Sequence, residues 1–218
     1  MKRLLIIEDE DGLQCLEEGV HKYTLLRYMI YRVVFSIWTK FWKDKAKWIG
    51  YLDLTSGPGY SQTPTLKKKG KMVGASPIIA LKTEPKFTCM IFIEKRYDYY
   101  GALKKRLGAY KNCKIHLGNA NDVVNSALWE IDGRCLVCVD PFRPSDISWR
   151  IIDKILREEF CDLIGVLPAP FIQRPVGRFY NRLYIRALSQ HMPPSFSLNC
   201  VRSCKTGFLQ YCMRLYRD

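Results

Sequence analysis

The feature that most constrains the fold is an apolar run that ends in an acid and a glycine turn. Residues 48–52 are followed by Asp53 and then by Gly-Pro-Gly at 57–59. A strand that stops in such a turn exposes backbone N–H groups and lets a ligand approach the main chain. A second apolar run, residues 89–93, also ends in an acid, Glu94. An acid that closes the second strand of a βαβ unit commonly binds ribose hydroxyls, so the pair predicts a nucleoside site.

Strands and helices alternate along the rest of the chain. Shorter apolar runs predict further strands at residues 114–117, 135–139 and 162–167. Helices are predicted between them, at about residues 76–81, 97–110, 123–130, 145–156 and 176–190. Ser76, which precedes a proline, and Ser145 are expected as N-caps. The alternation predicts an α/β fold with a doubly wound, mostly parallel, Rossmann-like sheet.

The two ends of the chain carry weaker patterns. An N-terminal helix is predicted over about residues 20–43, where apolar residues recur at three-to-four spacing. Its apolar positions are Leu25, Leu26, Met29, Ile30, Val33, Val34, Ile37, Trp38, Phe41 and Trp42. Its basic residues take the other side: Lys22, Arg27, Arg32, Lys40 and Lys43. In the tail, residues 196–201 suit a strand, and residues 208–216 suit a helix slightly better than a hairpin partner.

The length of 218 residues predicts a single domain over residues 1–218. We expect an N-terminal helical segment at 1–47 and a Rossmann-like core at 48–218. A basic insertion at 60–75 delays the helix that should follow the glycine turn. Without the insertion, Asp53 and Glu94 lie about 25 residues apart, near the usual spacing of a nucleotide-binding βαβ unit.

Polar residues stand where four of the predicted strands end. They are Asp53, Glu94, Asn119 and Asp140. In doubly wound sheets the ligand lies outside the carboxyl ends of the strands, so these residues predict one site. A dinucleotide site would need Gly-x-Gly-x-x-Gly, but Gln62 occupies the third glycine position. The delayed helix also removes the usual seat for a pyrophosphate. A cofactor without phosphates, such as S-adenosyl-L-methionine, does not need that seat.

The motifs and their order resemble the class I S-adenosylmethionine-dependent methyltransferases and, more narrowly, the three-Cys-motif partner protein family. The matching segments are His21-Lys22 with Tyr28, then residues 51–59, 74–81, 92–94 and 139–142. The chain departs from the family pattern in two places. Ala75 separates the glycine from Ser-Pro, and Arg143 stands where the family has glycine. The resemblance implies a methyltransferase-like fold and a possible protein partner.

The resemblance also implies roles for the strand-end residues. The methionine part of the cofactor would be bound by Asp53, Ser56, Gly57 and Gly59. Glu94 would accept from the ribose hydroxyls, and Asn119 and Ala120 would lie along the adenine edge. The alternative for each is an ordinary strand-to-loop turn.

Asp140, Pro141 and Phe142 stand where amino-methyltransferases carry Asp/Asn-Pro-Pro-Tyr/Phe. In that motif the carboxylate and a proline carbonyl orient an exocyclic amine, and the aromatic ring stacks on the base. Such enzymes often extrude the target base first. This chain has a single proline there, and the alternative is that Asp140 only caps a helix.

The net charge of +14 points to a polyanionic partner, with nucleic acid as the leading class. Lys67, Lys68, Lys69 and Lys71 lie in the insertion. Arg174, Arg178, Arg182 and Arg186 recur every four residues along one predicted helix face. Both groups are candidate phosphate contacts, and the alternative is a solvated basic surface.

Cysteine usage favours a reducing compartment. The nine cysteines are odd in number and lie mostly in apolar runs, which is typical of buried thiols in a cytoplasmic protein. Cys135 and Cys138 would point to opposite faces of one strand, so we expect no metal site there. The N-terminal apolar stretch is too short for a signal peptide, and no run of about 20 apolar residues predicts a membrane span.

Three functions fit these features. We favour an enzyme, an S-adenosylmethionine-dependent methyltransferase that acts on nucleic acid, with a base amine as the acceptor. The second is a non-catalytic or partner-dependent nucleic-acid-binding subunit that keeps the fold. The third is a methyltransferase for a small molecule or a protein, in which the basic surface is incidental.

Overall fold

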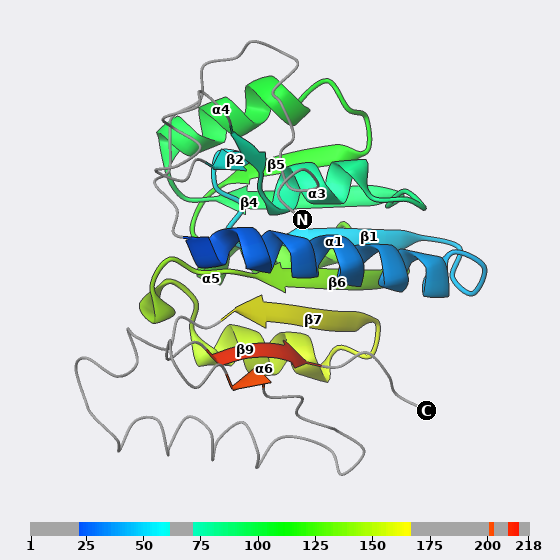
Figure 1. The fold of residues 1–218 in the computed structure, drawn as a ribbon. Coiled ribbons are helices and arrows are strands. Elements are labelled where there is room, and N and C mark those ends of the chain that lie inside the picture. The colour runs from blue at the N-terminus through cyan, green and yellow to red at the C-terminus, as the bar shows by residue number, and fades with distance from the viewer. Residues whose placement is uncertain (1–21, 62–71, 167–200, 203–208, 214–218) are drawn as a thin grey trace.

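The computed structural model describes residues 22–61, 72–166, 201–202 and 209–213. Within them, a seven-stranded sheet runs in the order β5-β4-β1-β6-β7-β9-β8 (Figure 1). The parallel strands are β1 (Ile49–Asp53), β4 (Cys89–Glu94), β5 (Cys113–Leu117), β6 (Arg134–Val139) and β7 (Cys161–Val166). The chain order reverses beside β1, which is where ligands bind in doubly wound sheets.

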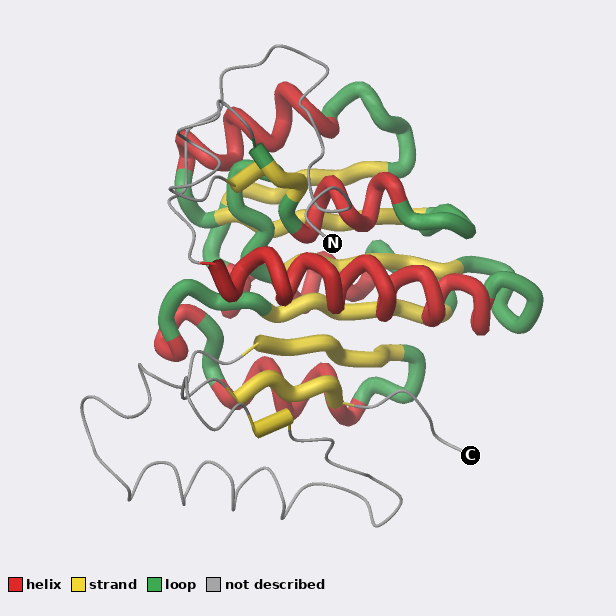
Figure 2. Tube along the Cα trace, viewed as in Figure 1, coloured by secondary structure: helices red, strands yellow, loops and turns green. Residues whose placement is uncertain are grey.

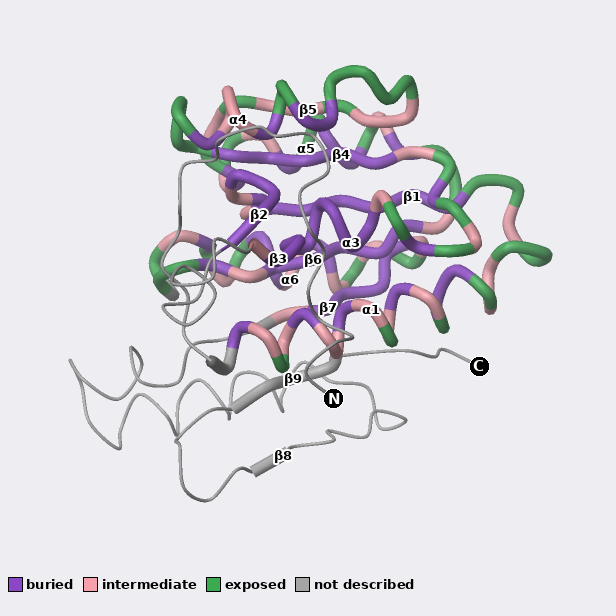
Figure 3. The backbone as a smooth tube through the Cα atoms, turned by 45° about the horizontal axis from the view of Figure 1, so that its top comes forward, coloured by how far each residue is buried: buried purple, intermediate pink, exposed green. Residues whose placement is uncertain are grey.

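Helices cover both faces of this sheet (Figure 2). The helices are α1 (Lys22–Trp42), α3 (Ser76–Lys82), α4 (Tyr97–Leu107), α5 (Ala120–Trp129) and α6 (Trp149–Arg157). Side chains of α1, α3 and α4 share one buried cluster with one face of the strands. Side chains of α5 and α6 share a second cluster with the other face. The central strands are accordingly buried along their length (Figure 3).

Alternation along β6 places its two cysteines on different faces. Cys135 belongs to the cluster under α5 and α6, whereas Cys138 belongs to the cluster under α1. The predicted separation of this pair is therefore confirmed.

Helix α1 buries part of the predicted apolar set together with rings outside it, since Trp38 was predicted to be buried but Tyr31 and Phe35 were not. Tyr31, Phe35 and Trp38 are at most 2% exposed, whereas Leu26, Val33 and Ile37 are 52–58% exposed. The Tyr31 and Phe35 rings stack at 5.5 Å, and Phe35 meets the ring of Tyr51 on β1 at 5.0 Å. Helix α1 carries apolar side chains on several of its sides, and the side with the large aromatic rings packs against the sheet because it buries the most area.

Helix α1 is fixed by buried carboxylates near both of its ends. Near its C-terminal end, Trp38 Nε1 donates to Asp162 Oδ2 at 2.9 Å. Arg134 Nη2 lies 3.1 Å from the same oxygen. Near the N-terminal end, Arg27 Nη1 donates to Asp140 Oδ1 at 2.6 Å. These contacts set the position of the helix across the sheet.

The two N-caps predicted at Ser76 and Ser145 were wrong. Ser76 is the first residue of α3, after Ala75 as N-cap, and its hydroxyl bonds to Asp53 instead. Ser145 lies in a 3-10 turn (Pro144–Asp146), and α6 begins later with Ser148 as its N-cap.

The tail is a strand where a helix was favoured. β9 (Leu209–Met213) pairs antiparallel with β7, and β8 (Val201–Arg202) pairs antiparallel with β9. The antiparallel edge of β7 satisfies the backbone of residues 209–213, so pairing overrides their weak helical spacing. The predicted helix at 176–190 lies outside the described residues.

The insertion leaves and rejoins the core through a short ribbon. β2 (Tyr60–Ser61) pairs antiparallel with β3 (Val73–Gly74). Ala75 N also donates to Gly59 O at 2.8 Å, which brings the two ends of the insertion together. The four lysines between the strands lie outside the described residues.

None of the helices that the structure describes is long and apolar enough to span a bilayer.

Replacing Trp38 by Phe should lower the free energy of unfolding by about 1–3 kcal/mol, because the buried Asp162 loses one donor. Urea unfolding followed by far-UV circular dichroism measures this. Trp129→Phe is the control, since Trp129 is 89% exposed and contributes little to the core. Equal stability of the two variants would contradict a role of the indole N–H in docking α1.

Candidate functional site

The loops after β1, β4 and β6 are joined by hydrogen bonds at the carboxyl edge of the sheet. Gly57 N donates to Glu94 Oε2 at 2.8 Å, and Ser56 N donates to the carbonyl of Ile93 at 3.1 Å. On the other side, Asp140 N donates to Thr55 Oγ1 at 3.1 Å. The three strand-terminal acids predicted for one site therefore lie in adjoining, directly connected loops.

The glycine turn has a backbone that requires its glycines. Gly57 and Gly59 have φ values of 67° and 93°, in the region that L side chains rarely adopt. Arg106 Nη1 donates to the carbonyl of Pro58 at 2.6 Å, and its guanidinium lies 4.8 Å from the centre of the Tyr60 ring. Helix α4 thus fixes the turn, in which Pro58 and Gly59 are buried and Gly57 is half-buried.

Asp53 is a fully buried carboxylate surrounded by neutral donors. Tyr51 Oη donates to Oδ2 at 3.0 Å, Thr55 N donates to Oδ1 at 3.1 Å, and the Ser76 hydroxyl also bonds to it. Burial outweighs these bonds and raises the pKa of Asp53 to about 6. Among the described residues no cation forms an ion pair with Asp53. A ligand with a positive charge would compensate this carboxylate.

Glu94 is 7% exposed and held by two backbone groups. Gly57 N donates to Oε2 and Arg96 N donates to Oε1, both at 2.8 Å. A carboxylate offers about four acceptor positions, so two remain for a ligand that carries hydroxyls. The backbone contacts fix how the carboxylate is turned.

Asp140 differs from the other two acids because it has a cationic partner. Arg27 Nη1 lies 2.6 Å from Asp140 Oδ1, and the two side chains are 22% and 11% exposed. Burial raises the pKa of Asp140, while Arg27 and the Tyr31 hydroxyl act in the opposite direction. Arg27 was predicted on the basic outer side of the helix, and that prediction was wrong. The next two residues of the motif differ in exposure, since Pro141 is buried and Phe142 is 66% exposed.

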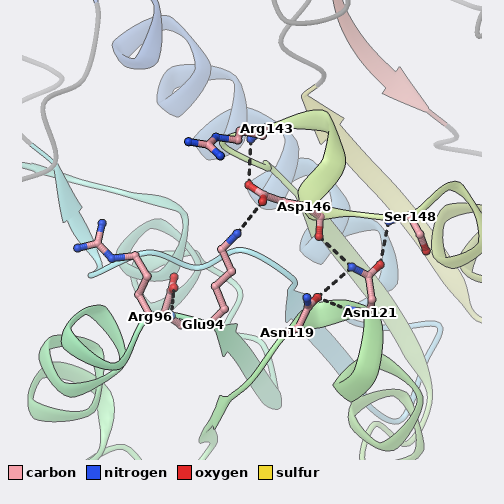
Figure 4. Close-up of polar contacts among 8 residues, drawn as sticks. Glu94, Arg96, Asn119, Asn121, Arg143, Asp146 and Ser148 are labelled. Atoms are coloured by element: carbon pink, nitrogen blue, oxygen red, sulfur yellow. Dashed lines mark hydrogen bonds and ion pairs between the residues drawn. The ribbon is translucent and has the colours of Figure 1, made fainter.

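Asn119 and Ala120 start helix α5 beside this group. Asn119 is its N-cap, and its Oδ1 accepts from Asn121 N at 3.0 Å. Asn121 Nδ2 also donates to the carbonyl of Asp146 at 3.0 Å, and Lys95 Nζ donates to Asp146 Oδ1 at 2.6 Å. Figure 4 shows how these side chains connect the loops after β4, β5 and β6. Asn119 Oδ1 is thus used to cap α5, and the place of Asn119 and Ala120 along the adenine edge stays a prediction.

The predicted phosphate contacts lie outside the described residues. They are Lys67, Lys68, Lys69, Lys71, Arg174, Arg178, Arg182 and Arg186. The base of the insertion is described, and it lies beside α1, because the hydroxyls of Tyr28 and Ser61 are 2.8 Å apart. The lysine loop therefore departs from a point next to the glycine turn.

Sequence reasoning missed Arg27, Tyr31 and Thr55. Arg27 and Tyr31 are four residues apart on the aromatic side of the first helix, and that spacing was the available signal. Thr55 carried no signal of its own beyond its place after Asp53. Within residues 22–61 and 72–166, no group of three or more His, Cys, Asp or Glu side chains could hold a metal ion.

Comparison with known proteins gives matches of fold only. No protein-family model matches the chain, and no curated protein matches it in sequence. Protein LPL1258 from Legionella pneumophila matches with a TM-score of 0.57 and 14% identity, over 75% of this chain and 73% of that one. The hMettl16 catalytic domain in complex with MAT2A 3'UTR hairpin 6 matches with a TM-score of 0.52 and 9% identity, over 96% and 78%.

A methyltransferase from Geobacter sulfurreducens also matches, with a TM-score of 0.51 and 11% identity, over 90% of this chain and 81% of that one. The fold is that of the Rossmann-like methyltransferases. The predicted fold class is thereby confirmed. Membership of the three-Cys-motif partner family stays a prediction.

Replacing Asp53 by Asn should stabilise the protein at pH 7.5. The pKa of Asp53 is raised above its unfolded value of 3.8, so its effect on stability becomes less favourable as pH rises from about 4 through about 6. The ionised form costs on the order of 3 kcal/mol at pH 7.5, and asparagine removes that charge while the Tyr51 hydroxyl can accept from its amide.

The measurement is urea unfolding of Asp53→Asn and wild type at pH 7.5 and pH 4.5. The difference between them should be largest at pH 7.5 and shrink at pH 4.5, where wild-type Asp53 is protonated. Asp132→Asn, at an exposed position, controls for the loss of one surface charge. A difference independent of pH would rule out a raised pKa at Asp53.

Proposed function

We propose that this chain is an S-adenosyl-L-methionine-dependent methyltransferase that acts on nucleic acid, with a base amine as the acceptor. The observation that carries the proposal is the trio of carboxylates at the switch point of the sheet. Asp53 is buried with no cationic partner among the described residues, Glu94 is held by backbone N–H groups, and Asp140 is paired with Arg27. Three acids in three different environments suit three different tasks.

The described residues fit the cofactor. The ammonium group of a methionine moiety would supply a cation that no described residue gives Asp53. Glu94 keeps acceptor positions for ribose hydroxyls, and the half-buried Gly57 is where the turn would meet the cofactor. When bound, the cofactor would supply a methyl group on a positively charged sulfur. Ser56, Asn119 and Ala120 border the same loops and complete the proposed cofactor site.

The acceptor side would be formed by Asp140, Pro141 and Phe142. A carboxylate at Asp140 can accept a hydrogen bond from an exocyclic amine, and the exposed Phe142 ring offers a surface for a base. The single proline distinguishes this loop from the Pro-Pro motif of amino-methyltransferases.

Nucleic acid as the substrate class is supported by charge and by position. The net charge of +14 favours a polyanion, and the lysine insertion starts and ends beside the glycine turn. A structure of the same fold, the hMettl16 catalytic domain, contains a 3'UTR hairpin. A protein partner, as in the three-Cys-motif partner family, and a cytoplasmic location remain proposals from sequence motifs and cysteine usage.

Transfer of tritium from labelled S-adenosylmethionine onto separate RNA, DNA and protein pools tests the proposed function. Label on RNA or DNA would support it. Label on protein alone would favour the third function. Binding of cofactor and nucleic acid without transfer would favour the non-catalytic or partner-dependent subunit.

Glu94→Ala should weaken binding of S-adenosylmethionine roughly 30- to 150-fold. Two hydrogen bonds to a charged acceptor would be lost, on the order of 2–3 kcal/mol. Isothermal titration calorimetry measures the affinity. Because Glu94 also holds the glycine turn, thermal unfolding of the variant is recorded beside it. Glu130→Ala, at the C-cap of α5 and therefore at the end of that helix away from Asn119, is the control. Unchanged affinity in Glu94→Ala would remove the ribose assignment.

Replacing Lys67, Lys68, Lys69 and Lys71 together by Gln should flatten the salt dependence of nucleic-acid binding. If each lysine contacts a phosphate of duplex DNA, the log–log slope falls by about 3–4, and by somewhat less on a single strand. Sequence preference should survive, because phosphate contacts position a ligand without reading it. Fluorescence anisotropy over a salt series gives the slope. A slope that stays at its wild-type value would mean that the four lysines contact no phosphate and belong to a solvated loop.

A further inference from the structure

Helix α1 contributes a charged side chain to the predicted acceptor site. Arg27 Nη1 donates to Asp140 Oδ1 at 2.6 Å, although the two residues are 113 positions apart in the chain. The Asp140 backbone is held separately, because Asp140 N donates to Thr55 Oγ1 at 3.1 Å. The acid is therefore fixed through its backbone by the loop after β1 and through one side-chain oxygen by α1.

The surroundings of Asp140 would otherwise oppose its ionisation. The titratable and charged groups that face it come from α1, β1 and β6. They are Arg27, Tyr31, Asp53 and Cys138. Among these described neighbours Arg27 is the cation. Burial raises the pKa of Asp140, and Arg27 is the described cation that acts against this rise.

Tyr31 adds a neutral donor to the same cluster. Its side chain is fully buried, and its hydroxyl has no hydrogen bond of regular geometry with a described residue. The hydroxyl nevertheless acts on Asp140 and shifts the pKa of that acid downward. Arg27 and Tyr31 thus both act on Asp140 from the same side of α1. Arg27 acts through its charge, and Tyr31, four residues later, acts through its hydroxyl.

We propose that Arg27 is a positioning residue that holds Asp140 ionised and turned, so that Asp140 is a fixed hydrogen-bond acceptor and not the base for the acceptor amine. The inference deepens the proposed function and rests on it. Arg27 donates to Oδ1, and the carboxylate keeps acceptor positions for an amine N–H. The guanidinium stabilises the charged form of Asp140, which favours its role as a hydrogen-bond acceptor.

The proton and electron balance follows from this arrangement. The amine nitrogen forms the new N–C bond with its lone pair. The S–C bond breaks with its electron pair remaining on sulfur, which becomes a neutral thioether. The methylated amine then releases one proton to water, while Asp140 stays a carboxylate throughout.

The first test is the titration of Asp140, which needs no turnover. Carboxyl carbons of 13C-aspartate protein are followed by NMR against pH, and Asp140→Asn assigns the signal. Arg27→Gln should raise the pKa of Asp140 by about one unit or more, since an opposite charge at this distance lowers an acid by about 1–3 units. Arg32→Gln is the matched control, because Arg32 lies on the same helix and is half-buried. It should leave the titration unchanged.

The second test separates charge from orientation. Arg27→Lys keeps the charge but lacks the planar fork, so the pKa of Asp140 should stay close to wild type while kcat falls at every pH. In Arg27→Gln the acidic limb of the kcat–pH profile should shift to higher pH, by as much as the pKa of Asp140 rises. Cofactor affinity should stay within a few-fold in both variants. Circular dichroism checks folding, and Arg27→Lys remains informative if Arg27→Gln does not fold.

Two results would overturn the inference. One is an Asp140 signal that titrates alike in wild type and in Arg27→Gln. The other is a kcat–pH profile that stays at its wild-type position although the pKa of Asp140 has risen. The ion pair would then be a purely structural contact. If wild type transfers no methyl group to any pool, the proposed function fails, and the NMR titration still decides whether Arg27 controls the charge of Asp140.

Discussion

The docking of helix α1 across the sheet is the constraint on which the rest of the structure depends. The rings of Tyr31, Phe35 and Trp38 supply the buried area, and aromatic packing of this kind is strongly stabilising. The polar contacts at Asp140 and Asp162 have a different effect. A buried ion pair adds little net stability, because desolvation offsets its attraction. Asp140 follows the C-terminal end of β6, whereas Asp162 lies near the N-terminal end of the neighbouring strand β7, so the two contacts fix where along the strands the helix lies.

Comparison of two buried acids separates a structural carboxylate from a functional one. Asp162, near the start of β7, bonds to the Trp38 indole N–H and the Arg134 guanidinium, which is typical of a structural role. The described residues give Asp53 neutral donors only, and burial raises the pKa of Asp53 to about 6. A group left in that state lowers stability at neutral pH, which is typical of a functional position rather than of a structural one.

Much of the sheet could be predicted from sequence, because each central strand is a short apolar run that ends in a polar residue. Asp53, Glu94 and Asp140 could be grouped for the same reason, since parallel strands bring their carboxyl ends to one edge. The buried face of α1 could not, because Leu26, Val33 and Ile37 have the same spacing as the aromatic residues. The pairing of Arg27 with Asp140 depends on that face and on a contact between distant segments, so no local pattern reveals it.

The basic insertion shows why the delayed helix does not disturb the site. Tyr60 pairs with Gly74, and Ala75 N bonds to the carbonyl of Gly59, so the chain returns to the point that it left. Ser76 then reaches Asp53 from the start of α3, as it could if the helix followed the turn directly. Closing a loop costs conformational entropy that grows only slowly with length, and the ribbon confines that cost to the segment outside it. A lysine-rich segment can therefore be carried beside the three acids while their geometry is set by the core alone.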